Sequence, residues 1–127
     1  MIDAEDYRIW LAEEFRHAID RFREDIIDHD PLQGICVVDI TMGDNTFSAV
    51  ITFPLDGTLS AQNPPSLEFT AKTNLSVGQR TGIKSIARSA AVNALMDGQY
   101  CLLPILERIH GTLLVFQQED VSLSKES

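Results

Sequence analysis

The fold is decided by residues 34–53, which read GICVVDITMGDNTFSAVITF. The first nine of these residues are rich in β-branched side chains, which favour a strand. In the last eight, apolar side chains alternate with polar ones, and alternation is typical of a strand with one buried face. Between the two segments, Gly43, Asp44 and Asn45 are residues typical of turns. The stretch therefore predicts a β-hairpin.

Helices are predicted on both sides of this hairpin. Before it, apolar residues recur every three or four positions from Leu11 to Ile26, and this predicts a helix that ends near residues 27–30, before Pro31. After it, the same periodicity predicts a helix from about Gln79 to Asp97, which Gly98 stops. The inner face of the first helix is predicted to hold Leu11, Phe15, Ala18, Ile19, Phe22 and Ile26, and that of the second Ile83, Ile86, Ala87, Ala90 and Ala94.

The remaining segments add shorter elements. A loop over residues 55–65 leads to a third strand at Ser66–Lys72, with Leu67, Phe69 and Ala71 facing inward. Residues 100–109 predict a short helix, with Pro104 in its first turn and Gly111 as its stop. Residues 112–117 predict a fourth strand.

These elements define an α+β fold. It has an N-terminal helix, a three- to four-stranded mostly antiparallel sheet, a second long helix packed on one sheet face, and a short C-terminal helix and strand. A chain of 127 residues has the length of one core. Residues 1–121 are therefore interpreted as a single domain, and residues 122–127 as a frayed polar C-terminal tail.

The composition of the chain and its acidic N-terminal sequence favour a cytoplasmic location. With 44% apolar and 23% charged residues, the chain is unlike disordered, collagen-like or coiled-coil sequences. No apolar window is long enough for a membrane span, and the acidic start differs from a secretory signal, so no membrane contact is expected. Cys36 and Cys101 lie in apolar runs without metal-ligand spacing, which predicts buried, reduced thiols.

The charge of the chain is unevenly distributed. The net charge is −9, and no Lys or Arg occurs from Glu24 to Ala71. Eight acidic residues fall in that span: Glu24, Asp25, Asp28, Asp30, Asp39, Asp44, Asp56 and Glu68. Such a surface repels polyphosphate and attracts basic partners.

The first predicted helix carries an acidic stripe opposite its apolar face. Trp10 lies at the border of this stripe, and two interpretations stay open for it: an interface anchor with a polar rim, or a ring packed beneath a loop or the C-terminal segment. Spacing alone would also allow the stripe to hold a divalent metal, but a solvated face is commoner, so no metal or cofactor is expected. The predicted partner-binding residues are Trp10, Glu13, His17, Asp20, Glu24 and Asp28.

A second candidate site lies at the start of the second predicted helix. Residues 78–85, GQRTGIKS, have the glycines and lysine of a phosphate-binding loop, but the second glycine does not directly precede the lysine, so nucleotide hydrolysis is not expected. Helix amides together with basic side chains can still hold an anion, although a plain glycine-containing helix start is the simpler interpretation. The possible anion-binding residues are Gly78, Arg80, Lys84 and Arg88.

Arg80, Lys84 and Arg88 also form one ridge of the second helix, since they recur every fourth residue. The order helix, three strands, helix, with the basic segment ARSAA at residues 87–91, is similar to the double-stranded RNA-binding domain over about residues 5–97. The resemblance implies RNA binding through this ridge, but the adjacent lysines that this family carries are absent. A second interpretation pairs the ridge with the acidic first helix through intramolecular ion pairs.

The sequence favours a small acidic protein-binding module that masks a basic partner surface. An inhibitor, an immunity-type or antitoxin-type protein, and an acidic chaperone are the expected kinds. A nucleic-acid-binding domain that uses the basic ridge is the alternative, and a small enzyme with an anion site at the second helix comes third. No enzyme activity is expected, since His17, His29 and His110 lie in different elements and no nucleophile motif is present. A homodimer is possible, because the apolar C-terminal half of the second helix needs a cover from residues 100–109 or from another subunit.

Overall fold

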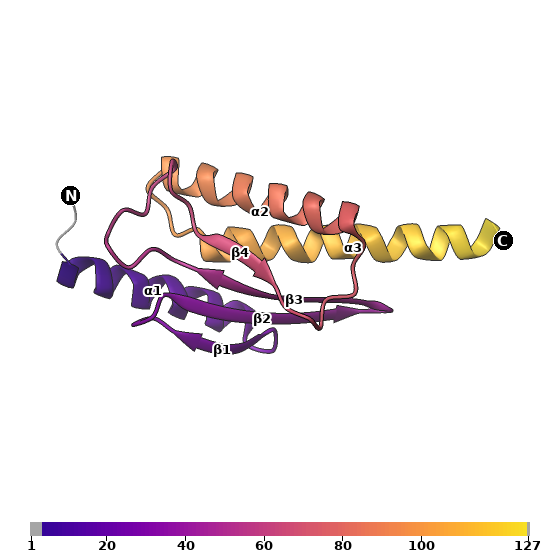
Figure 1. Ribbon diagram of the computed structural model, residues 1–127, viewed down its shortest axis with the longest axis horizontal. Coiled ribbons are helices and arrows are strands. Elements are labelled where there is room, and N and C mark those ends of the chain that lie inside the picture. The colour runs from indigo at the N-terminus through magenta and orange to yellow at the C-terminus, as the bar shows by residue number, and fades with distance from the viewer. Residues whose placement is uncertain (1–3, 127) are drawn as a thin grey trace.

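The computed structural model describes residues 4–126, without the side chains of Ala4 and residues 120–126. The described chain folds as a helix, four strands and two helices (Figure 1), which confirms the α+β class. The helices are α1 (Ala4–Phe22), α2 (Val77–Met96) and α3 (Leu102–Glu126). The strands are β1 (Ile26–Asp30), β2 (Ile35–Met42), β3 (Asn45–Thr52) and β4 (Ser66–Phe69).

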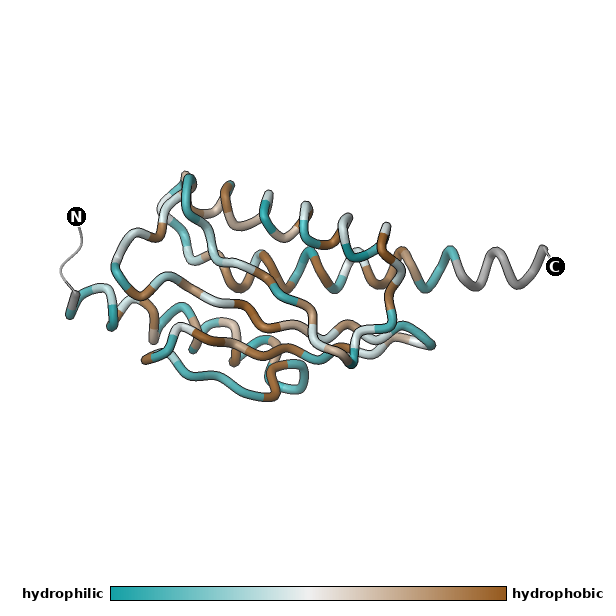
Figure 2. Tube along the Cα trace, in the orientation of Figure 1, coloured by the Kyte–Doolittle hydropathy of each residue, from teal (hydrophilic) through white to brown (hydrophobic). Residues whose placement is uncertain are grey.

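The strands form one antiparallel sheet in the order β1-β2-β3-β4. The predicted hairpin is β2–β3, which pairs from Ile35↔Thr52 to Met42↔Asn45. Gly43 in its turn has a φ of 58°, a conformation that favours glycine. Figure 2 shows that β2 and β3 carry the apolar stretches of the sheet, whereas β1 is mostly hydrophilic.

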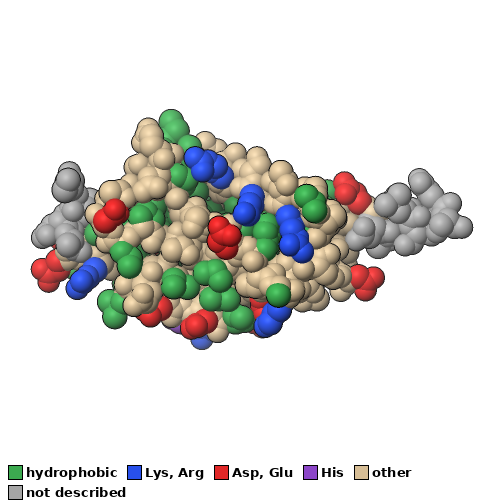
Figure 3. Space-filling model, viewed as in Figure 1, with side chains coloured by type: hydrophobic (Ala, Val, Ile, Leu, Met, Phe, Trp, Pro, Cys, Tyr) green, Lys and Arg blue, Asp and Glu red, His purple; other side chains and the backbone are tan. Residues whose placement is uncertain are grey.

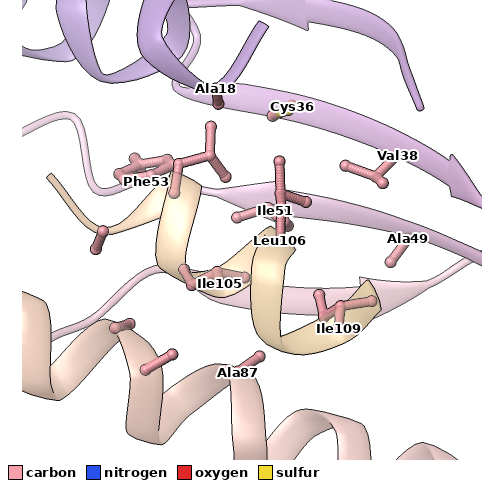
Figure 4. Packing of buried hydrophobic residues seen from close by; sticks show 14 of the residues in the cluster. Ala18, Cys36, Val38, Ala49, Ile51, Phe53, Ala87, Ile105, Leu106 and Ile109 are labelled. Atoms are coloured by element: carbon pink, nitrogen blue, oxygen red, sulfur yellow. The ribbon is translucent and has the colours of Figure 1, made fainter. Parts of the chain in front are cut away.

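All three helices lie on one face of the sheet. α3 lies against β2 and β3, and it packs between α1 on one side and α2 on the other. Figure 4 shows Ile105, Leu106 and Ile109 of α3 pointing among side chains from the sheet and from α2. The core therefore sits between the sheet and the helix layer, and α3 is its central helix.

The predicted helix near residues 100–109 is present, but its stop at Gly111 and the predicted strand at residues 112–117 are wrong, because α3 is one continuous helix. Leu106, Ile109 and Leu113 are completely buried at helical spacing, whereas Leu114 and Val115 are each 49% exposed. Burial of one helical face thus outweighs the strand propensity of residues 112–117. Gly111 does not stop the helix, and its φ is not positive. Pro104 lies in the first turn of α3, as predicted.

The predicted end of the first helix is also wrong. α1 ends at Phe22, and residues 26–30 form β1 beside β2. Backbone contacts hold this change of direction, since the Asp25 N–H donates to the Phe22 carbonyl and the Asp39 N–H donates to the Asp25 carbonyl. Pairing with β2 therefore overrides the helical period of the sequence. β1, and not a C-terminal strand, is the fourth strand.

Smaller features of the predicted core agree with the structure or shift slightly. Leu11, Phe15 and Ala18 are buried on α1, and α2 buries Ala91 in addition to most of its predicted face. Ile86 is only partly buried. Ala71 is exposed, contrary to prediction, because β4 ends at Phe69.

The two cysteines and the chain ends bear on the other sequence predictions. Cys36 and Cys101 are free and buried, as predicted, and burial raises the pKa of the Cys36 thiol to about 12. Among the described residues, no helix is both long and apolar enough to cross a membrane. The predicted boundary between a domain of residues 1–121 and a frayed tail stays a prediction. The structure does not describe the side chains of residues 120–126, and residue 127 lies outside the described residues.

Candidate functional site

No described helix covers one face of the sheet, since all three helices pack on the other face (Figure 1), and residues 70–72 contact this face only near Ser48 and Asp39. The burial of β2 alternates, with Cys36, Val38 and Ile40 buried toward the helices. Residues between them therefore point to the uncovered side. We define the open sheet face by its outward residues on the four strands: Asp28, Asp30, Ile35, Val37, Asp39, Val50, Thr52 and Glu68.

The open sheet face has an aliphatic centre. Val37 is paired with Val50 across β2 and β3, and Ile35 lies next along β2; all three are partly exposed. Partly exposed aliphatic side chains in adjacent pairs can contribute apolar area to a contact with another molecule.

Acidic residues surround this centre. Asp28 and Asp30 are exposed on β1, and Glu68 is exposed on β4. Asp39 lies on β2, where Lys72 places its Nζ 3.3 Å from Asp39 Oδ2. The four strands contain no Lys or Arg, so the face is negative except where Lys72 borders it. In Figure 3, green and red side chains lie together over the strands, and a row of blue side chains follows α2.

Trp10 is not a free anchor on α1. Its ring is partly buried and lies between two other aromatic rings, with centroids 6.2 Å from Tyr7 and 5.3 Å from Tyr100. Tyr7 is fixed in turn, since its hydroxyl donates to the Pro54 carbonyl. Tyr100 leads into α3. This packing agrees with the second of the two open interpretations, in which Trp10 packs against another segment of the chain, and its role as a partner-binding residue stays a prediction.

The acidic stripe is only partly assembled. Glu13, His17 and Asp20 share an exposed face of α1, where Arg16 approaches Glu13 to 2.6 Å and Asp20 to 3.6 Å. The hydrogen bond from Arg16 holds the pKa of Glu13 below its usual value. Glu24 lies in the turn after α1 and Asp28 on the open sheet face, because α1 ends at Phe22. Among the described residues, no group of three or more His, Cys, Asp and Glu side chains could hold a metal.

The possible anion site does not form a phosphate-binding loop. Ser76 caps α2 and accepts from the Gln79 N–H at 3.1 Å, so Gly78 lies inside the first helical turn. The Arg80 guanidinium donates to the carbonyls of Leu75 and Thr73, each at 2.9 Å, and is therefore engaged within the chain. Lys84 and Arg88 remain exposed on α2.

The predicted ion pairs between the first helix and the basic ridge are wrong. α3 lies between α1 and α2, and no ion pair within residues 4–119 joins those two helices. Lys84 and Arg88 are therefore available to other molecules.

Glu14 is an important residue that the sequence prediction missed. It is completely buried, and its Oε1 and Oε2 accept from the N–H groups of Leu102 at 2.7 Å and of Cys101 at 3.0 Å. These contacts join α1 to the start of α3, where helix N–H groups lack partners within the helix. Its spacing from Leu11 and Ala18 could have revealed it, since steps of three and four place Glu14 on the buried face.

The chain matches no protein-family model, and its sequence matches no curated protein. The described surface of the chain offers two areas of different chemistry: an acidic face with an aliphatic centre on the sheet, and a short basic ridge on α2.

Proposed function

We propose that this protein is a small acidic protein-binding module that masks a basic surface of a partner protein with its open sheet face. The observation that carries the proposal is the joint placement of exposed carboxylates and partly exposed aliphatic side chains on strands that contain no Lys or Arg. An inhibitor, an immunity-type or antitoxin-type protein, and an acidic chaperone are the kinds of protein that this proposal covers. The cytoplasmic location that the sequence favours is part of the same proposal.

Charge complementarity favours a basic partner over a second copy of the chain. In a symmetric dimer formed through the open sheet face, each carboxylate patch would approach its own copy. Asp28, Asp30 and Glu68 are exposed and have no basic partner among the described residues, so such a pairing would be repulsive. A basic partner would instead be attracted by the carboxylates and held by contact with the aliphatic centre.

The exposed face of α1 remains the alternative surface that the sequence predicted. Glu13, His17 and Asp20 lie there without an exposed apolar anchor, because Trp10 packs against Tyr100. Arg16 also neutralises part of its charge. These features support the open sheet face over α1, and variants of equal charge change can compare the two surfaces.

We expect Asp28→Lys/Asp30→Lys to slow association with the partner about tenfold or more and to flatten its salt dependence, because rim charges mainly steer encounter. The partner is first isolated by affinity capture and purified, and its binding kinetics are then measured at two salt concentrations. The matched control is Glu13→Lys/Asp20→Lys, which changes the charge equally on α1 and should leave association within about twofold. Thermal melts confirm that both variants fold.

The comparison of the two variants decides whether the partner binds the open sheet face or the exposed face of α1. If only the α1 variant slows association, the partner binds the acidic stripe and not the open sheet face. If neither variant changes the kinetics, or if the chain purifies as a dimer closed through its open sheet face, the proposed function is wrong.

We also expect no sub-micromolar binding to duplex RNA at physiological salt. Arg80 is engaged with backbone carbonyls, so the ridge offers two exposed cations, and a chain of net charge −9 repels phosphates. Fluorescence anisotropy measures the binding of a labelled duplex of about 20 base pairs. A duplex of this length exceeds the span of one RNA-binding domain. Tight binding that Lys84→Glu/Arg88→Glu abolishes would instead favour the nucleic-acid hypothesis.

A further inference from the structure

The outer edge of β4 is not paired with another strand in the described chain. β4 ends the sheet order, with β3 as its neighbour on the other side. The Thr70 N–H donates to the Ser48 carbonyl, and this bond sets the phase of the ladder. Since antiparallel pairs alternate, Ser66 and Glu68 direct their backbone groups to β3, and Leu67 and Phe69 direct theirs outward. The edge therefore presents backbone donors and acceptors to any neighbour.

A groove of about 460 Å³ separates this edge from α2. One wall is Ser66–Glu68 of β4, and the other carries Lys84 and Arg88 of α2. Ile51 of β3 and Ile105 of α3 line the groove from the core side and are almost completely buried. The groove thus combines a free strand edge, an apolar lining and a basic wall.

The basic wall is available to a ligand. Lys84 and Arg88 are exposed and one helical turn apart, and neither has an ion-pair partner within residues 4–119. The Lys84 ammonium lies 5.7 Å from the centre of the Phe69 ring, which holds it beside β4. Among the described residues that line the groove, Glu68 is the one acidic residue beside two cations, so the charge of the groove is net positive. An occupant with carboxylates is complementary to it.

We propose that the groove between β4 and α2 binds an extended acidic peptide segment of a partner protein, which adds to β4 as a fifth strand. The peptide backbone pairs with the outward groups of Leu67 and Phe69. Its side chains alternate between the two faces of the sheet. The carboxylates lie on the helix side, where they reach Lys84 and Arg88 above Ile51 and Ile105, and the apolar side chains between them lie on the opposite side, beside the open sheet face. The groove lies on the helix side of β4 and the open sheet face on the other side, although Glu68 borders both. The two sites differ in charge, and the inference does not depend on the function proposed for the open sheet face.

A peptide fits this groove better than RNA does. Strand addition satisfies backbone groups that a nucleic acid would leave unpaired, and the apolar lining suits the methylene groups of glutamate side chains rather than phosphates. Two cations neutralise few phosphates, and the net charge of −9 opposes a polyanion.

The test uses a labelled, end-capped hexapeptide of alternating Glu and Val, with the Lys-Val hexapeptide as its charge-reversed counterpart. We expect the Glu-Val peptide to bind with a Kd on the order of 100 µM by fluorescence anisotropy, and the Lys-Val peptide not to bind. Lys84→Glu/Arg88→Glu should weaken binding at least about tenfold. The matched control Arg8→Glu/Arg23→Glu makes the same charge change at exposed positions of α1 and the following turn, and should keep affinity within about twofold.

Backbone pairing is tested separately from charge. We expect bound peptide to slow amide hydrogen exchange at Leu67 and Phe69 and to leave Glu68, which is already paired with β3, unchanged. N-methylation of alternate peptide amides on the edge that faces β4 should abolish binding, whereas N-methylation on the opposite edge should not. Equal binding of both methylated peptides, absent binding of the Glu-Val peptide, or displacement by sub-micromolar single-stranded or duplex RNA would each overturn the proposal.

Discussion

Replacement of Glu14 by alanine is expected to lower the free energy of unfolding by about 3–5 kcal/mol. It leaves two buried N–H donors without an acceptor, and it leaves a cavity. The N–H groups of Cys101 and Leu102 lose the carboxylate that accepts from both, at a site where the residue is 0% exposed. An unsatisfied buried group costs about 1–3 kcal/mol. Urea denaturation of the purified variant measures the loss.

The variant Glu14→Gln separates charge from packing, since it keeps the volume and one acceptor oxygen. Burial raises the pKa of Glu14 above its usual value of 4.5, because desolvation outweighs the two N–H bonds that favour the carboxylate. A raised pKa in the folded state means that the protonated form adds stability below the usual pKa, and that this stability is lost as pH rises through the raised pKa. The unfolding free energy of the wild type minus that of Glu14→Gln should therefore fall with rising pH. Denaturation of both proteins from about pH 4.5 upward tests it, and a gain in the stability of the wild type relative to the variant with rising pH would contradict it.

The hairpin and the two flanking helices could be predicted because their signals are local. Alternation along β3 and the turn at Gly43 are complete within residues 34–53, and the same is true of the apolar period in α2. β1 differs in this respect. In the sequence, Ile26 continues the helical period of α1. Its extended conformation is instead set by pairing with Val38 on β2, which is twelve residues away in the sequence.

α3 was mispredicted because composition and period disagree there. Residues 112–117 are rich in residues that favour strands, yet Ile109, Leu113 and the partly buried Phe116 follow helical steps from Leu106. Burial of that face against β2 and β3 supplies more stabilisation than strand propensity, which spans only about 1 kcal/mol per residue. The helical spacing of apolar residues therefore predicts the conformation of residues 112–117 better than their strand propensity does.

The acidic character of the candidate site could be predicted, but its location could not. The span from Glu24 to Ala71, without Lys or Arg, forms the whole sheet, so the charge of the open sheet face is already present in the sequence. Which sheet face stays uncovered depends on α3, whose course was mispredicted. In the same way, the contact of Trp10 with Tyr100 and the bonds from Arg80 to Thr73 and Leu75 need the folded chain to be seen.

Phe15 and Phe22 share one face in the helical period, yet their replacement by alanine is expected to differ strongly. Phe15 is 1% exposed, and its ring lies 5.5 Å from that of Phe53, so Phe15→Ala should cost about 3–5 kcal/mol of unfolding free energy. Phe22 is the last residue of α1, partly buried and stacked on His110 at 5.0 Å, so Phe22→Ala should cost about 1–2 kcal/mol.

The comparison of the two phenylalanine variants tests where α1 ends. Urea denaturation of both is measured beside Glu13→Ala, a surface change on the same helix that should leave the midpoint unchanged, because the ion pairs of Glu13 with Arg16 and His17 lie at the surface. A deletion at a helix end can be absorbed by local adjustment, whereas a deletion beneath the sheet cannot. Equal losses for Phe15→Ala and Phe22→Ala would mean that Phe22 is packed as tightly as Phe15, which would contradict its partly buried position at the end of α1.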